Sequence, residues 1–381
     1  MISSDRKAAF FTLYAGLLKG LNLVHQRGWD EQELQHFFPD IKDQWLPYLQ
    51  SRHQALEVTS CHWEALESCH QILKSWNDPV EKKILENRLN GIAQYYRETQ
   101  KKFCDEQTLK FYLGTHELTQ LNPSLTTRPF STSTEKLTSV EAKAQLEADL
   151  IGLFPEHDTT VKLSSRTLAR ASTGKHSIRL RKDYEYSKEE LEQLTVHEGW
   201  VHLGSNLQGS LQSQLPWLAH WHPSVTSFQE GLALIAEIVG GCWTERRQWE
   251  IIRRHQAALL ALRGWNAKEV YHWLLDKGIG AESSLSTVLR VYRGCSLEGG
   301  MAFGKELLYV SGLQEWTKLS KEISSEDMQV ALAGKMSFSE WHLLKSTLKH
   351  KLLLAQIPEA LAHWTEHFQI QTLRFKLPPA A

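Results

Sequence analysis

The chain has 381 residues, of which 41% are hydrophobic, and its formal net charge at pH 7 is −1. This length gives room for two domains with a sizeable core, and the near-neutral charge gives no electrostatic reason to expect nucleic acid or an acidic membrane as a partner. No apolar run reaches the roughly 18 residues of a membrane span. The five cysteines follow no paired-motif spacing, which indicates reduced thiols and a cytoplasmic protein.

Residues 1–112 are predicted to form an N-terminal helical region. Apolar residues recur at helical spacing from Phe10 to Val24, and Pro79 opens a longer run at a position that suits a first helical turn. Two interpretations stay open for this region: a helical bundle packed on the rest of the chain, or a cleft wall or partner surface. Turn-forming residues dominate 113–137, and we place a domain boundary there.

The next segment predicts a helix over 138–153 and short strands at 161–163 and 177–182. Polar and apolar residues alternate from Ser177 to Lys182, which is typical of a half-buried or edge strand. Such a strand either lines a cleft, where a peptide adds to it as a further strand, or is an ordinary edge protected by its charges.

The stretch from His197 to His202, His-Glu-Gly-Trp-Val-His, carries the clearest chemistry. Ser187 and Glu190 have capping-box spacing and would start the helix that bears it. Two imidazoles and a carboxylate suit a zinc ion that keeps one position open for water. A second carboxylate beside the metal, Glu198, would take a proton from that water.

The two histidines are five residues apart, whereas the usual zinc-protease helix has an interval of four. On a regular α-helix five residues turn through roughly 500°, which leaves the side chains about 140° apart. A one-residue π-bulge would bring both rings to one ion, and Gly199 relaxes the backbone within the interval. The motif is therefore either a distorted metal-binding helix or a coincidence of composition.

A further carboxylate is offered by Glu230, in Ser-Phe-Gln-Glu-Gly-Leu-Ala. Glu230 is either a metal ligand or the cap of its own helix, because Ser227 and Glu230 also have capping-box spacing. Glu237 follows two helical turns later on the same face. It either orients a ligand imidazole or is solvated.

Helices are expected over 246–264, 267–278 and 325–369. Between them stand Arg290, Tyr292 and Arg293. An arginine in a cleft can clamp a terminal carboxylate through two hydrogen bonds, and a tyrosine near zinc can donate to a developing oxyanion. The alternative is that these residues form structural ion pairs.

Together these motifs resemble the flavohemoglobin expression-modulating QEGLA-motif family, whose animal members include the microtubule-associated tyrosine carboxypeptidases. Three further stretches fit the family: 289–294, 303–312 and 332–336. The resemblance thus covers the chain from about residue 105 to residue 370. The sequence departs at Gly304-Lys305-Glu306, where the family commonly has Thr-Lys-Asp, and at the bulky Trp200 of the motif helix.

The resemblance implies a zinc metallopeptidase fold, in which His197, His202 and Glu230 bind Zn²⁺ and Glu198 is the catalytic base. We expect an α+β, predominantly helical protein with a gluzincin-like core and a small mixed sheet. Residues 113–381 would form the zinc metallopeptidase-like catalytic domain. The implied activity is that of a carboxypeptidase acting on the C-terminus of a peptide or protein. The alternative is a non-catalytic regulatory protein that keeps the fold.

Overall fold

Helices dominate the structure, and two small sheets complete it, so the α+β class expected from the sequence is confirmed. None of the helices in the described ranges combines the length and apolar character that a membrane crossing needs. The computed structural model describes residues 2–19, 31–39, 57–100, 135–165, 169–293, 295–319 and 323–355, together with residues 358 and 361.

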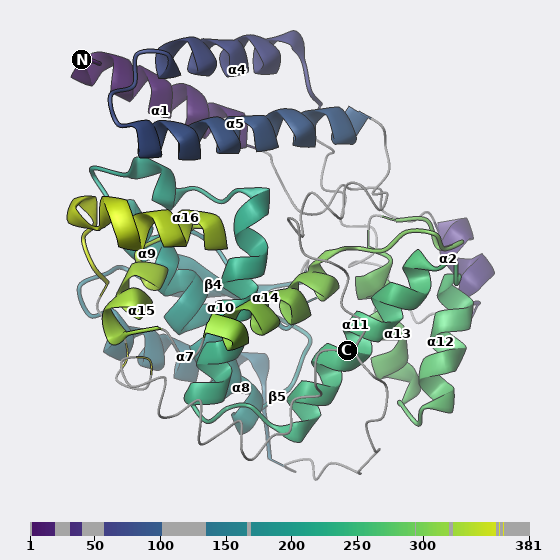
Figure 1. Ribbon diagram of the computed structural model, residues 1–381. Coiled ribbons are helices and arrows are strands. Elements are labelled where there is room, and N and C mark those ends of the chain that lie inside the picture. The colour runs from purple at the N-terminus through teal and green to yellow at the C-terminus, as the bar shows by residue number, and fades with distance from the viewer. Residues whose placement is uncertain are drawn as a thin grey trace.

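Three of the described N-terminal helices form a layer along one side of the molecule (Figure 1). They are α1 (Ser4–Leu18), α4 (Ser60–Leu73) and α5 (Pro79–Gln100). Their buried side chains belong to the same hydrophobic cluster as those of the central helices, so this layer packs on the rest of the chain. The predicted domain boundary at 113–137 lies almost entirely outside the described residues and stays a prediction. Leu21 and Val24, the last apolar residues of the predicted first helix, also lie outside them.

The centre of the fold is α10 (Thr226–Val239), in which every residue is buried. It crosses α14 (Lys305–Leu319), and the two helices lie side by side in Figure 1. Their backbones touch where Gly231 meets Gly312. A Cβ atom on Gly231 would lie 2.3 Å from the carbonyl carbon of Gly312, so the crossing requires glycine.

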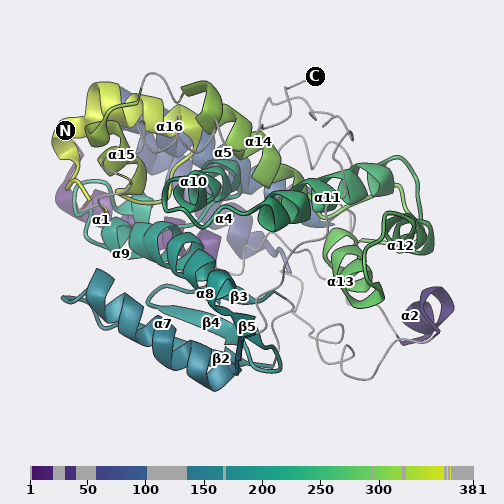
Figure 2. The ribbon, with the colours of Figure 1, turned by 90° about the horizontal axis from the view of Figure 1, so that it is seen from below.

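Two small sheets and α7 form the layer below α10, as Figure 2 shows. The larger sheet has the order β2-β4-β3, with β2 parallel and β3 antiparallel to β4. Its apolar face packs against α7 and the start of the motif helix in one hydrophobic cluster. The bounds in this layer are β1 Lys136–Leu137, α7 Ser139–Leu153, β2 Thr160–Ser164, β3 Ala171–Thr173, β4 Ser177–Arg181 and β5 Tyr186–Ser187, where β1 pairs with β5.

The strand predicted at 177–182 is β4, and it is the central strand of its sheet rather than an edge strand. Ile178 and Leu180 are buried on one face while Arg179 is exposed on the other. The half-buried alternative is therefore confirmed, and the edge alternative is wrong. A central strand alternates in the same way as an edge strand when its sheet has only one covered face. The edge strand beside the motif helix is β3, which contacts it directly.

A second hydrophobic cluster lies among the helices on the right of Figure 1. It is formed by α2 (Glu31–Phe37), α11 (Glu245–Leu262), α12 (Ala267–Asp276) and α13 (Ala281–Val291). Gly264, with φ of +99°, turns the chain between α11 and α12.

The region predicted to be helical over 325–369 consists of several short helices in its described part. Gly334 lies between two of them, where a Cβ atom would stand 2.7 Å from the Cβ atom of Leu218. The pieces are α15 (Ser325–Leu332), α16 (Phe338–Leu343), a π-helical turn η5 (Leu344–Leu348) and a 3₁₀ turn η6 (Lys349–Lys351). Of the rest of that range, only 352–355, 358 and 361 are described.

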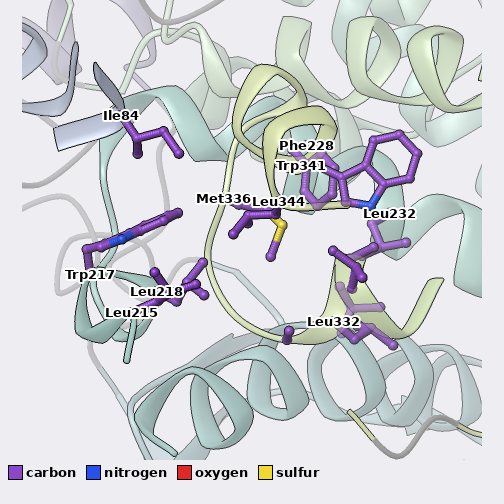
Figure 3. Close-up of a cluster of buried hydrophobic side chains, with 14 of the residues drawn as sticks. Ile84, Leu215, Trp217, Leu218, Phe228, Leu232, Leu332, Met336, Trp341 and Leu344 are labelled. Carbon is purple, nitrogen blue, oxygen red and sulfur yellow. The ribbon is translucent and has the colours of Figure 1, made fainter. Parts of the chain in front are cut away.

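Arg88 of α5 joins the N-terminal layer to the loop before α10 and to the C-terminal helices. Its guanidinium binds both carboxylate oxygens of Glu340, at 2.6 and 2.8 Å, and donates to the carbonyl oxygens of Trp217 and Lys335. It also stacks on the Trp217 ring. Figure 3 shows that ring on the same side of the cluster as Ile84 of α5.

We predict that Gly231→Ala destabilises the protein by about 3 kcal/mol or more, because the added methyl group meets backbone that cannot move aside. Chemical denaturation followed by circular dichroism measures the change. Gly16→Ala is the matched control, since a Cβ atom on this residue of α1 meets nothing within 4 Å. Equal stability of the two variants would contradict the close crossing.

We predict that Glu340→Gln costs about 3 kcal/mol or more, because it leaves the buried Arg88 without its counter-charge. Burial opposes the charged form of Glu340, but Arg88 outweighs it and holds the pKa of this carboxyl below its usual value. The wild-type protein therefore loses this stabilisation as the pH falls below about 4.3, and the variant lacks that part of the acid dependence. Denaturation at pH 7 and pH 3 tests both statements.

Candidate functional site

The helix that carries the histidine motif is distorted, as its five-residue interval predicts. It begins as α8 (Lys188–Leu194), continues as the π-helical segment η2 (Thr195–Leu203, nine residues) and ends as α9 (Gly204–Ser210). The hydrogen bonds of a π-helix join residues five apart, so such residues share a face. The rings of His197 and His202 accordingly lie with centroids 4.9 Å apart.

The start of this helix is fixed by the predicted capping box. The Ser187 hydroxyl accepts from the backbone N–H of Glu190, and the Glu190 carboxylate accepts from the backbone N–H of Ser187. Gly199, in the middle of η2, faces Leu150 of α7 at a Cβ distance of 3.3 Å. The small residue therefore also lets η2 pack closely on α7.

Glu230 of α10 joins the two histidines. One carboxylate oxygen, Oε2, lies 3.5 Å from Nε2 of His197, and the other, Oε1, lies 3.7 Å from Nε2 of His202. Glu230 does not cap its helix, because α10 already begins at Thr226, and the Ser227 hydroxyl instead contacts that of Ser311. The capping interpretation of Glu230 is therefore excluded.

The donor set of His197, His202 and Glu230 fits a divalent metal ion. One atom from each residue lies within 4.8 Å of the others. Oε2 of Glu230 is buried and makes no hydrogen bond within the described part of the chain. A buried carboxylate oxygen without a donor is an expected feature of a ligand that faces an ion.

Glu237 lies on the far side of His197, where it is fully buried rather than solvated. Its Oε1 is 2.7 Å from Nδ1 of His197, and Arg247 binds both of its oxygens at 2.8 and 2.9 Å. A carboxylate on Nδ1 fixes the ring orientation and leaves Nε2 facing Glu230. Burial disfavours the charged imidazole, but Glu230 and Glu237 outweigh it and raise the pKa of His197 to about 9.

Glu198 lies beside this group on the same helix. The Thr173 hydroxyl, at the end of edge strand β3, donates to Oε2 of Glu198 at 2.5 Å. The charge of Glu198 also acts on His197 and Lys305, so its carboxylate borders the histidine–glutamate cluster. The sequence gives no signal for Thr173, because its strand is only three residues long.

Lys305 and Tyr309 of α14 complete the surroundings. The Lys305 ammonium lies 2.8 Å from Oε1 of Glu230 and 5.5 Å from the centre of the Tyr309 ring. The Tyr309 ring centroid is 6.2 Å from that of His197. Sequence reasoning gave neither residue a role, although they stand four apart within the stretch 303–312 and so share a helix face.

The charges of this cluster compensate one another. Burial raises the pKa of Glu230, but Lys305 and His202 outweigh it and hold that pKa well below its usual value. The pKa of Lys305 is raised, since Glu230 outweighs the effect of burial.

The three residues predicted to bind substrate occupy different surroundings. Nε and Nη2 of Arg290 both donate to Oε1 of Glu306, at 2.9 and 2.6 Å. The Tyr292 hydroxyl donates to the carbonyl of Trp265 at 2.5 Å, inside the second hydrophobic cluster. Because Tyr292 directly follows α13 and faces the corner at Gly264 and Trp265, the structure does not bring it to the histidine–glutamate cluster.

Arg293 is half-buried and pairs with no acidic side chain of the described residues. Burial and the neighbouring charge of Arg290 lower its pKa to about 10. Arg290 itself lies closer to the cluster, because its charge acts on Tyr309.

Comparison with known proteins supplies a family. A search of the curated proteins found no match. The family model described as microtubule-associated tyrosine carboxypeptidase matches residues 85–374, a span that begins inside α5 and includes η2, α10 and α14. This match extends over more than half of the chain. The chain therefore belongs to the microtubule-associated tyrosine carboxypeptidase family, which places it among carboxypeptidase-like peptidases.

Proposed function

We propose that the protein is a zinc-dependent carboxypeptidase with a gluzincin-like core. His197, His202 and Glu230 would hold the ion, and Glu198 would act as general base. The observation that carries the proposal is the convergence of one possible ligand atom from each of the three residues within 4.8 Å, across a π-helical turn. One of the two Glu230 oxygens is also buried and receives no hydrogen bond within the described residues. Two histidines and one carboxylate form a typical catalytic zinc ligand set, which leaves a position for water or substrate.

Zinc bound there would polarise the scissile carbonyl and increase the acidity of the attacking water. Glu198 accepts the proton of that water and delivers it to the leaving amine. The Thr173 hydroxyl holds Oε2 of Glu198, which leaves Oε1 for the proton. Glu237 keeps the His197 ring in place through Nδ1. Tyr309, rather than Tyr292, is the tyrosine beside the site that can donate to the substrate carbonyl oxygen.

The substrate class we propose is the carboxyl end of a peptide or protein, in agreement with the family name. Arg293 is the stronger candidate to bind a terminal carboxylate, since Arg290 is already paired with Glu306. Arg254, also near Arg290, is paired with Glu250, yet burial and the charge of Arg290 lower its pKa to about 9. The excess of guanidinium groups over acids favours binding of an added anion.

The first prediction from this proposal concerns the metal. The wild-type protein is expected to hold about one zinc ion per chain, and His202→Ala is expected to lose it, because two ligands rarely retain a structural or catalytic zinc. Elemental analysis of the purified proteins measures the content. His272→Ala, an exposed histidine on α12, is the matched control and keeps its zinc. Equal zinc in all three samples would rule out this ligand set.

The second prediction concerns the base. Glu198→Gln is expected to keep fold and zinc and to lose about 10² to 10⁴ in cleavage rate, because an amide accepts hydrogen bonds but takes no proton at neutral pH. Glu192→Gln, an exposed glutamate on the same helix, is the control with unchanged rate. Zinc content, thermal melting and peptide cleavage are measured on the same samples.

Two results of that experiment count against the mechanism. Cleavage at the wild-type rate by zinc-loaded Glu198→Gln would refute the role of Glu198. Failure of the wild-type protein to cleave any member of a peptide library with varied C-termini would favour the non-catalytic regulatory alternative.

A further inference from the structure

The carboxylate of Glu230 has two oxygens in different surroundings. Oε1 is 2.8 Å from the Lys305 ammonium and 3.7 Å from Nε2 of His202. Oε2 faces His197 at 3.5 Å and receives no hydrogen bond within the described chain. The Lys305 side chain is 29% exposed and the Glu230 side chain 6%. The lysine therefore reaches from the open side of the site to an otherwise enclosed carboxylate.

This arrangement is fixed by the crossing of two helices. Lys305 is the first residue of α14, and Glu230 immediately precedes the Gly231 that contacts Gly312 of the same helix. The lysine also lies over the Tyr309 ring, which restricts its stem. The ion pair is therefore built into the helix packing.

Lys305 has two consequences for a metal ion at this site. An ammonium that binds Oε1 prevents that oxygen from joining Oε2 as a second ligand atom. Its positive charge also repels a divalent cation held by the same carboxylate, so it weakens metal binding. When no ion is bound, the same charge compensates a carboxylate that is buried beside two imidazoles.

We propose that Lys305 is a positioning residue that makes Glu230 a one-oxygen metal ligand and serves as its counter-ion when the metal is absent. The inference rests on the zinc site proposed above. A ligand that occupies one coordination position instead of two keeps another position available for water and substrate. Lys305 thus lowers the affinity for the metal and keeps one coordination position open.

Lys305→Met tests the proposal, because methionine keeps much of the length but neither charge nor donor. The metal-free variant is expected to melt at a lower temperature than the metal-free wild type, since Glu230 loses its counter-ion. Its affinity for zinc, measured by chelator competition, is expected to rise about tenfold with removal of the repelling charge. Lys318→Met is the matched control on the same helix, since the Lys318 side chain is 68% exposed.

A spectroscopic measurement separates positioning from simple support of the fold. With Co²⁺ in place of zinc, the visible absorption of Lys305→Met is expected to weaken, because a second Glu230 oxygen raises the coordination number and four-coordinate Co²⁺ absorbs most strongly. Lys305→Gln keeps a donor for Oε1 without the charge. It is expected to retain the wild-type spectrum and still to bind zinc more tightly.

The outcomes separate the two proposals. If wild-type protein binds neither zinc nor Co²⁺, the zinc function fails and the inference fails with it. If wild type binds the metal, and Lys305→Met has unchanged affinity and an unchanged Co²⁺ spectrum, only the role of Lys305 is refuted. Weaker zinc binding by both the Met and Gln variants would also overturn it. If the Met variant does not fold, the zinc affinity of Lys305→Gln decides whether the charge weakens metal binding.

Discussion

Two carboxylates on a helix with no exposed residue impose the main constraint on this structure. Glu230 and Glu237 lie seven residues apart on α10, and neither can be solvated. A buried charge is tolerated only when it is paired and hydrogen-bonded. Three helices near α10 contribute the partners: η2 supplies the histidines, α11 supplies Arg247, and α14 supplies Lys305.

These partners reach the carboxylates because α10 and α14 pack closely and because η2 is π-helical. The contact between Gly231 and Gly312 brings α14 near enough for a lysine at its first residue to meet Glu230. The π-helical turn brings two histidines five residues apart to one carboxylate. A regular helix in η2 would direct one imidazole away from Glu230, and the site would lose a donor.

The sequence allowed prediction of features that depend on local spacing. The capping box at Ser187 and the distortion between His197 and His202 follow from intervals of three and five residues, and both are present. Features that depend on neighbours distant in sequence were not predictable. The alternation of polar and apolar residues in β4 shows only that one face of the strand is covered. Its central position depends on β2 and β3, which pair with it on either side. The short motif around Tyr292 likewise does not reveal that α13 directs this residue to Trp265.

Arg88 has a consequence for how the chain can be divided. The family match begins at residue 85, inside α5, so a shortened chain starting there would keep Arg88 but lose Tyr14, whose hydroxyl lies 3.4 Å from the guanidinium. It would also lose the first turn of α5 and all of α1 and α4, which cover the shared hydrophobic cluster. The part of the chain that the family shares and the segment that precedes it are thus physically one unit. A chain cut at residue 85 would expose apolar side chains that α1 and α4 cover, so the segment before residue 85 is part of the folded unit.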